Sequence, residues 1–447
     1  IAETIDMVKD SKGVWTSAEV SAKVGSNKYY KYRVVNGETT YDVCDLWAKV
    51  AAKDSVATQI VDIDSAVPAN GWETTYVNPF GISGSIRKSY TDAVIYEMHI
   101  TDWSQAFRSS IEKDKPGTFK EITEALNNGF GEYLRDLGVT HVQILPMFEY
   151  AKCGDDDKAY NWGYNPYNWN TPESRYVQNM NDGTDAIAQM REMIKAFHDN
   201  NIAVNMDVVY NHTMGTGSGS IYDMTIPKYF YRMSGGSYAS GSGCGNETAS
   251  ERAMVRKYIV DSVVYWAKEY HIDGFRFDLM AVHDKETMRA VRAALDEIDP
   301  SIMVYGEGWT GGESGLSSAE QSLKASIYQV ERVGAFSDDI RDGIRGNVFD
   351  AVDRGFVNGK DGMEESIKFS VVGAVPHPQV VLTKNEKGTK SWAGSPIQSI
   401  NYASCHDNLT LWDKIATSNP EDSEADRIKM NMLSSAIVLT SQGIPFM

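Results

Sequence analysis

The chain has 447 residues with 43 basic and 61 acidic side chains, which gives a formal net charge of −18. This length fits two or three domains, or one large barrel with a smaller module. No apolar run reaches the roughly 18 residues of a membrane span, and the acidic charge argues against a nucleic-acid partner. The cysteines lie far apart without a CxxC pair, so we expect free thiols rather than zinc or redox chemistry.

The first 85 residues contain short alternating segments without a long helical period. The run from Tyr29 to Val34 alternates like a half-buried strand, and Asn36-Gly37 is a turn signal. These patterns predict a first domain over residues 1–85, a small β-sandwich module that lacks its opening strands.

From about residue 92, short apolar strands alternate with longer amphipathic helices. Helices are expected over 185–200 and 285–298, where apolar residues recur at helical spacing. The eight expected strands are 93–100, 140–145, 202–209, 272–277, 302–306, 334–337, 399–404 and 443–447. Parallel strands joined by crossover helices predict an α/β fold, a (β/α)8 TIM barrel over residues 86–447. A doubly wound sheet is the alternative, but no GxGxxG follows the first strand.

The two ends of the chain carry further expectations. The sequence starts at Ile1 without a signal-peptide pattern, so localisation stays open between the bacterial cytoplasm and secretion. It stops at Met447 inside an apolar run, which predicts a barrel truncated in or after its eighth strand. An open barrel would expose a sheet edge, so a C-terminal fragment that completes it is a candidate partner.

Four of the expected strands end in polar motifs, DVVYNHT, GFRFDLM, YGEGW and SCHDN, that would meet at one mouth of the barrel. Residues two apart in a strand share a face, so Arg276 and Asp278 should point the same way. The positive guanidinium then favours the ionised form of the Asp278 carboxyl group. Glu307 has no basic residue near it in sequence, and its pKa should rise where other carboxylates face it. A carboxylate nucleophile and a carboxylic acid about 5–5.5 Å apart are typical of a retaining glycosidase. Asp407 would be a third carboxylate, and Tyr160, Trp162, Tyr164 and Trp309 would form platforms for sugar rings.

The order of these motifs resembles the four sequence regions of the α-amylase superfamily, glycoside hydrolase family 13. The segment YNWGYNP from residue 160 closely resembles the YNWGYDP motif of type I pullulanases and limit dextrinases, with Asn165 where many members have Asp. The resemblance covers residues 10–447 and implies that Asp278 is the nucleophile, Glu307 the acid/base and Asp407 the transition-state stabiliser. Further substrate-binding positions are implied at Tyr160, His212, Arg276, Leu279, Trp309, His406 and Asn408.

Other parts of the chain receive weaker assignments. Asp207 is either a substrate-binding residue or a buried acid paired with Arg276. The first strand resembles the family's YEXHVRDFS but has Thr101 in place of Arg, so we assign it no role. Residues 1–85 resemble a truncated family 48 starch-associated module. Structural or surface roles are expected for His99, His141, His198, His271, His283 and His377.

The resemblance implies hydrolysis of α-1,6-glucosidic branch links in pullulan, starch and limit dextrins, with retention. No organic cofactor is required; calcium stays open, because Asp155–Asp157 carry the charge of a calcium loop but not its ligand spacing. The alternatives are an α-1,4-hydrolase or transglycosylase of the same superfamily, and a non-catalytic glucan-binding fragment. An α-glucan is the expected partner, with no nucleic acid and no membrane.

Overall fold

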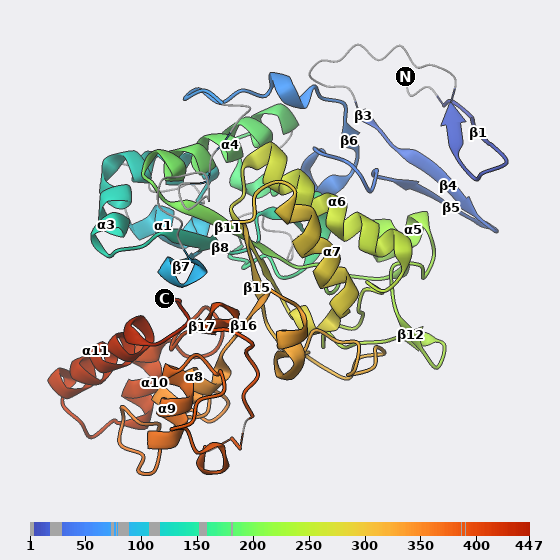
Figure 1. Cartoon of the computed structure of the whole chain (residues 1–447). Coiled ribbons are helices and arrows are strands. Elements are labelled where there is room, and N and C mark those ends of the chain that lie inside the picture. The colour runs from blue at the N-terminus through green and yellow to red at the C-terminus, as the bar shows by residue number, and fades with distance from the viewer. Residues whose placement is uncertain are drawn as a thin grey trace.

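The computed structural model describes residues 4–17, 29–72, 76, 78, 89–106, 117–151, 159–179, 182–385, 387–388 and 390–447. Its centre is a sheet of eight parallel strands whose order around the sheet follows the chain (Figure 1). The strands are β7 (Ile95–Met98), β8 (His141–Ile144), β11 (Ala203–Val208), β14 (Gly274–Phe277), β15 (Met303–Gly306), β16 (Gly334–Phe336), β17 (Ser399–Asn401) and β18 (Ile444–Pro445). Each lies inside a range predicted from the sequence, and the (β/α)8 barrel is confirmed.

The eighth strand closes the ring of strands. Ile95 forms a parallel bridge with Phe446, and the Met447 amide donates to the Ile95 carbonyl at 2.9 Å. The Glu97 amide returns a hydrogen bond to the Met447 carbonyl at 2.8 Å, and Figure 1 shows the C-terminus beside β7. The expectation of an open edge at the eighth strand is therefore wrong, because β18 pairs with β17 and the next residue, Phe446, bridges to Ile95 of β7.

Helices surround the barrel on the outside. They are α1 (Ile100–Ala106), α2 (Phe119–Ala125), α3 (Gly131–Asp136), α4 (Gly183–Asp199), α5 (Ile221–Thr225), α6 (Ala253–Tyr270), α7 (Lys285–Asp296), α8 (Asp338–Arg345), α9 (Glu364–Val371), α10 (Leu411–Ser418) and α11 (Glu424–Thr440). The two helices predicted from periodicity are confirmed as α4 and α7. Helix α4 begins two residues earlier than predicted because the Asp182 side chain caps its first turn.

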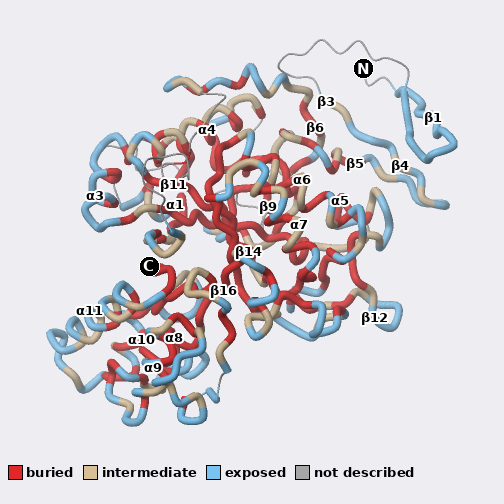
Figure 2. The backbone as a smooth tube through the Cα atoms, in the orientation of Figure 1, coloured by how far each residue is buried: buried red, intermediate tan, exposed pale blue. Residues whose placement is uncertain are grey.

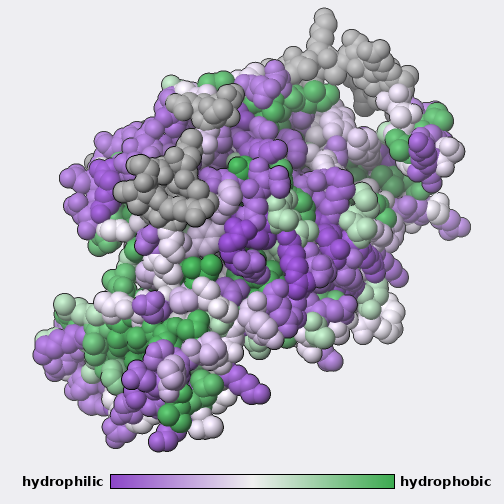
Figure 3. Space-filling model, in the orientation of Figure 1, coloured by the Kyte–Doolittle hydropathy of each residue, from purple (hydrophilic) through white to green (hydrophobic). Residues whose placement is uncertain are grey.

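The strands of the barrel form the most deeply buried part of the molecule (Figure 2). Every residue of β11 is buried, and so is every residue of β14 and β15. Such continuous burial is typical of parallel strands that are covered on both faces. The smaller lobe of helices α8 to α11 also exposes apolar side chains, among them Met432 on α11, and Figure 3 shows apolar surface there.

The described residues before the barrel form three two-stranded antiparallel sheets. These pair β1 (Met7–Lys9) with β2 (Trp15–Ser17), β3 (Tyr29–Tyr30) with β6 (Thr58–Gln59), and β4 (Tyr32–Asn36) with β5 (Thr39–Val43). The predicted turn at Asn36-Gly37 joins β4 to β5, and Gly37 adopts a φ of 63° that favours glycine. The Asn36 side chain donates to the Met224 carbonyl at 3.0 Å, which attaches this hairpin to the barrel lobe. The sandwich and its boundary at residue 85 stay predictions.

Three cysteines in the described part of the chain are free thiols, as predicted, whereas Cys153 lies outside it. None of the helices in this part combines the length and apolarity needed to cross a bilayer.

Candidate active site

The acidic residues singled out from the sequence lie at the carboxyl ends of neighbouring strands. Asp207 is near the end of β11, Asp278 follows β14 and Glu307 follows β15. His406 and Asp407 lie in the loop after β17. Because the eight strands are parallel, these ends share one mouth of the barrel, where this fold carries its chemistry.

Arg276 is the centre of this cluster. Its Nη1 atom donates to Asp207 Oδ1 at 3.0 Å and to Asp278 Oδ1 at 2.9 Å, and its Nη2 atom lies 2.9 Å from Glu307 Oε1. The guanidinium is 3% exposed, so little solvent screens these ion pairs. Asp207 is thus a buried acid paired with Arg276, one of its two predicted roles, while contact with substrate stays a prediction.

The Asp278 carboxylate receives a second donor that the sequence did not reveal. Asn211 Nδ2 donates to Asp278 Oδ2 at 2.7 Å and to the Asp278 carbonyl at 3.0 Å. His212 lies 2.6 Å from Asn211 Oδ1 and 3.1 Å from the Tyr164 carbonyl. Asn211 precedes His212 in the DVVYNHT motif. This position next to a predicted site residue could have identified Asn211 as part of the site.

Glu307 is held in a tight corner between β14 and β15. Its Oε2 atom accepts the Leu279 amide at 2.8 Å, and Leu279 adopts the left-handed φ of 41° that is costly for a residue with a side chain. A Cβ atom on Gly306 would lie 2.4 Å from the Phe277 carbonyl oxygen, so the backbone can approach only because residue 306 is glycine. Burial raises the pKa of Glu307 to about 7, with Asp278 adding to the rise and Arg276 opposing it.

The rise in the pKa of Glu307 that the sequence predicted is confirmed, but its surroundings contain a group that the sequence did not show. Glu307 does have a basic partner, Arg276, which lies on the neighbouring strand rather than nearby in sequence. Burial, and not repulsion alone, is the largest cause of its raised pKa. Burial likewise raises the pKa of Asp207 to about 6, against the opposing effect of Arg276.

Glu97 on β7 holds His406 from the other side of the mouth. Glu97 Oε2 accepts the His406 amide at 2.6 Å, and Oε1 lies 2.7 Å from His406 Nδ1. Asp407 lies 3.6 Å from His406 Nε2, and 53% of its side chain is exposed, so this carboxylate is open toward solvent. The first strand, given no role from the sequence, therefore contributes a residue of the site.

The aromatic residues divide into two groups. Tyr160 and Trp162 are exposed at the mouth; Trp162 Nε1 donates to the Tyr160 hydroxyl, which donates to Asp102 Oδ2 at 2.7 Å. Tyr164 instead stacks on His406 with ring centroids 4.9 Å apart and donates its hydroxyl to Asp207 Oδ2 at 2.6 Å. Tyr164 thus supports the polar cluster, while the first two rings are placed for contact with a ligand.

Three further predicted positions lie around this centre. Leu279 touches Glu307 through its backbone, and Asn408 is exposed beside Asp407. Trp309 is half-buried and packs against the cluster that contains Tyr305. The structure therefore gathers Asp207, Arg276, Asp278, Glu307, His212 and His406, and leaves the other predicted positions at the rim.

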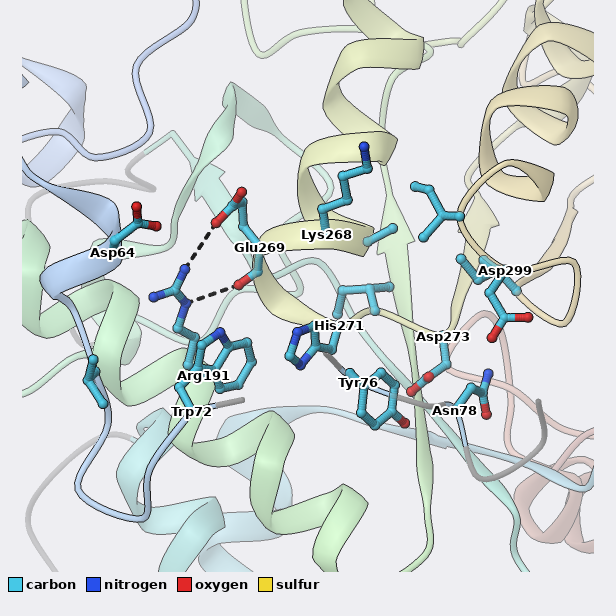
Figure 4. A pocket seen from close by; sticks show the side chains of 15 residues that line it. Asp64, Trp72, Tyr76, Asn78, Arg191, Lys268, Glu269, His271, Asp273 and Asp299 are labelled. Atoms are coloured by element: carbon cyan, nitrogen blue, oxygen red, sulfur yellow. Dashed lines mark hydrogen bonds and ion pairs between the residues drawn. The ribbon is translucent and has the colours of Figure 1, made fainter. Parts of the chain in front are cut away.

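A cavity of about 770 Å³ lies at the opposite, amino-terminal end of the strands (Figure 4). The His271 ring stacks beside it with two aromatic rings. Its centroid lies 4.2 Å from that of Trp72 and 4.9 Å from that of Tyr76. His198 pairs with Asp273 at 2.8 Å. These contacts agree with the structural roles predicted for His198 and His271. None of the residues that line the cavity belongs to the carboxylate cluster.

No group of metal-binding side chains occurs within the described residues. The acidic run Asp155–Asp157, considered for calcium from the sequence, lies outside them.

The barrel and its cluster define a class, because paired carboxyl groups at the mouth of a (β/α)8 barrel are the arrangement of a glycoside hydrolase. No family model matches the sequence. A pullulanase of Bacillus subtilis is 32% identical over 99% of this chain, and pullulanase 1 of Arabidopsis thaliana is 29% identical over 98%. The crystal structure of a Paenibacillus barengoltzii pullulanase with maltohexaose and α-cyclodextrin is 38% identical, with a TM-score of 0.89 over 98% of this chain and 67% of the other. The chain belongs to the pullulanase family of the α-amylase superfamily.

The chain spans only part of the relatives it matches. It corresponds to 59% of the Bacillus subtilis protein, 53% of the Arabidopsis protein and 52% of the Bacillus acidopullulyticus pullulanase structure, to which it is 39% identical with a TM-score of 0.85.

Proposed function

We propose that this protein hydrolyses α-1,6-glucosidic branch links in pullulan, starch and limit dextrins, with retention of configuration. The observation that carries the proposal is the cluster in which Arg276 binds both Asp278 and Glu307. Two carboxyl groups in different environments are what a retaining glycosidase requires, one as an ionised nucleophile and one as a protonated acid.

The first half of the reaction follows from these environments. Asp278 accepts from Arg276 and Asn211, and these donors stabilise its anion for attack on the anomeric carbon. Glu307, with its pKa raised to about 7, is protonated in a large fraction of molecules near neutral pH and delivers this proton to the departing glycosidic oxygen. The bond from carbon to Asp278 forms as the glycosidic bond breaks.

The second half returns the enzyme to its starting state. Glu307, now ionised, takes a proton from water, and the water oxygen displaces Asp278 from the anomeric carbon. Asp407, exposed at the mouth, stabilises the positive charge that develops on the sugar ring in both steps. The reaction as written needs no organic cofactor. The acidic run Asp155–Asp157 is the candidate site for a calcium ion.

The α-glucan substrate is supported by the names of the relatives and by the aromatic residues at the mouth. Solved pullulanases are complexed with maltotriose, maltotetraose and maltohexaose. In this chain, Tyr160 and Trp162 present exposed rings of the kind on which flat sugar faces stack, while His212, His406 and Asp207 surround the acids. Leu279, Trp309 and Asn408 are assigned to the side that receives the branch.

Product analysis on pullulan tests the reaction. Cleavage of α-1,6 links releases maltotriose, whereas an α-1,4-hydrolase releases panose or isopanose, and a transglycosylase yields longer products. Asp278→Asn and Glu307→Gln should each nearly abolish release of reducing sugar. Activity of either variant within about tenfold of wild type would contradict the assigned roles, since an essential group contributes far more than about 1.4 kcal/mol. Wild-type protein that binds maltotetraose but cleaves nothing would support the glucan-binding fragment.

A further inference from the structure

A line of buried polar side chains crosses the inside of the barrel and ends at His406. Asn205 on β11 donates to the Tyr305 hydroxyl at 3.1 Å, and this hydroxyl donates to Gln143 Oε1 at 2.9 Å. Gln143 Nε2 then donates to Glu97 Oε1 at 3.3 Å. Four strands thus supply a network whose last acceptor is the Glu97 carboxylate, and buried networks of this kind fix side-chain positions.

The two oxygens of Glu97 hold His406 at two points. One accepts the backbone amide of residue 406 and the other lies 2.7 Å from the ring nitrogen Nδ1. This pair of contacts fixes both the path of the loop after β17 and the rotation of the imidazole. The Tyr164 ring stacks on the same imidazole and the Trp162 ring meets it edge-on, with centroids 5.2 Å apart, so His406 has little freedom to turn.

The charge of the imidazole follows from the groups that face it. Burial alone would lower the pKa of His406, and Arg276 on β14 acts in the same direction. Glu97 on β7 and Asp407 on the loop act in the opposite direction and raise the pKa to about 9. Among the described residues, Asp207 on β11, His99 after β7 and the Tyr164 hydroxyl are further titratable groups near this imidazole.

We propose that Glu97 is a positioning residue for the hydrolytic site: it holds His406 as a cationic donor and places the loop that carries Asp407. With Nδ1 directed at Glu97, the second ring N–H of His406 faces the mouth, 3.6 Å from Asp407 Oδ1. A charged donor there binds a sugar hydroxyl and keeps the neighbouring carboxylate in place for the charge that develops on the ring. The proposal deepens the function proposed above and depends on it for its kinetic consequences.

The first experiment compares Glu97→Gln with wild type on pullulan across pH. Glutamine keeps the size of the side chain but removes the charge, so His406 should lose its proton near or below neutrality. The ratio of kcat in the variant to kcat in wild type should fall by about tenfold or more between about pH 5.5 and about pH 8.5. Because both proteins contain Glu307, the pH dependence of that acid cancels in the ratio.

Two variants serve as controls. Glu97→Asp keeps the charge on a shorter side chain, so kcat should fall while the ratio stays independent of pH. Glu121→Gln removes another buried carboxylate, which accepts the Thr118 amide at 2.9 Å in the capping box of α2, away from the mouth. The kcat of Glu121→Gln should stay near that of wild type at every pH. A pH-independent ratio for Glu97→Gln would overturn the proposal, because a merely structural role lowers activity uniformly.

A second measurement needs no turnover, and its wild-type part does not depend on how the Glu97→Gln variant folds. Histidine ring resonances of the wild-type chain are titrated by NMR, and His406 is identified by the signal that His406→Asn lacks. We expect a midpoint at about pH 9 in wild type, as the pKa of His406 requires, and a midpoint at or below the ordinary histidine value in Glu97→Gln. A wild-type midpoint at or below the ordinary value overturns the proposal even if pullulan is cleaved. A high midpoint without cleavage of pullulan would instead refute the proposed function alone.

Discussion

Replacing Glu307 with glutamine should stabilise the folded protein at neutral pH while removing its activity. In the folded state the pKa of this acid rises from 4.5 to about 7, chiefly because the side chain is buried. Below the unfolded pKa the carboxyl group is protonated in both states and contributes no difference. As the pH rises toward the folded pKa and beyond, the unfolded chain ionises first, so wild type loses stability. Glutamine does not ionise and avoids this loss.

The magnitude follows from the two pKa values. Each tenfold change in an acid dissociation constant is about 1.4 kcal/mol, so the rise from 4.5 to about 7 corresponds to about 3 kcal/mol. Between about pH 5 and about pH 8, the free energy of unfolding of Glu307→Gln should therefore gain about 2 to 3 kcal/mol relative to wild type. The quantity to measure is the change with pH in the stability difference between variant and wild type. Replacing a protonated acid with an amide changes the free energy of unfolding by an amount that does not depend on pH.

Urea unfolding, followed by tryptophan fluorescence at several pH values, measures this difference. Glu313→Gln provides the matched control, since Glu313 is exposed in the loop that follows the same strand and its replacement should leave the pH dependence unchanged. If the difference between Glu307→Gln and wild type is the same at both ends of the pH range, the acid is not held protonated by the fold. A loss of stability that grows with pH would refute the reasoning outright.

Three other outcomes follow from the same contacts. On pullulan, kcat/KM should fall as the pH rises through about 7, because the pKa of Glu307 lies there and only its protonated form donates; a pH profile that stays flat to about pH 9 would contradict this. Tyr164→Phe removes the 2.6 Å donor to the Asp207 carboxylate and should destabilise the fold by about 1.5 to 3 kcal/mol, measured by urea unfolding; no change would mean that the hydroxyl contributes nothing to the cluster. Gly306→Ala places a Cβ 2.4 Å from the Phe277 carbonyl oxygen, so β14 and β15 must separate; thermal unfolding should move to lower temperature and pullulanase activity should fall, and a variant with wild-type behaviour would show that this corner is not tight.

The sequence was sufficient for the features that depend on local pattern. Eight strand ranges and the α4 and α7 helices follow from the spacing of apolar residues, and the barrel follows from their alternation. The position of Asp278 two residues after Arg276 predicted their contact, which the structure gives at 2.9 Å. Local periodicity determines which side chains share a face of one strand, and so such predictions were within reach.

Side-chain contacts between different strands could not be predicted from the sequence. Glu97 and His406 are 309 residues apart, and nothing in either motif indicates that they meet. The Arg276–Glu307 contact was missed for the same reason, because the register of β14 against β15 is set by packing in the closed barrel. Closure through Phe446 is also a property of the whole ring, since β18 finds its second partner at the beginning of the barrel.

One guanidinium among three carboxyl groups makes the site asymmetric. Arg276 supplies a single positive charge to Asp207, Asp278 and Glu307, so a dry cluster with all three acids ionised would carry excess negative charge. Asp278 is the most exposed of the three at 13% of its side chain and has Asn211 as a further donor, while Asp207 and Glu307 are more deeply buried. Burial raises the pKa of Glu307, the group that must donate a proton, whereas Asp278, the group that must attack, is the least buried of the three. The division of labour between nucleophile and acid comes from unequal burial around a shared arginine.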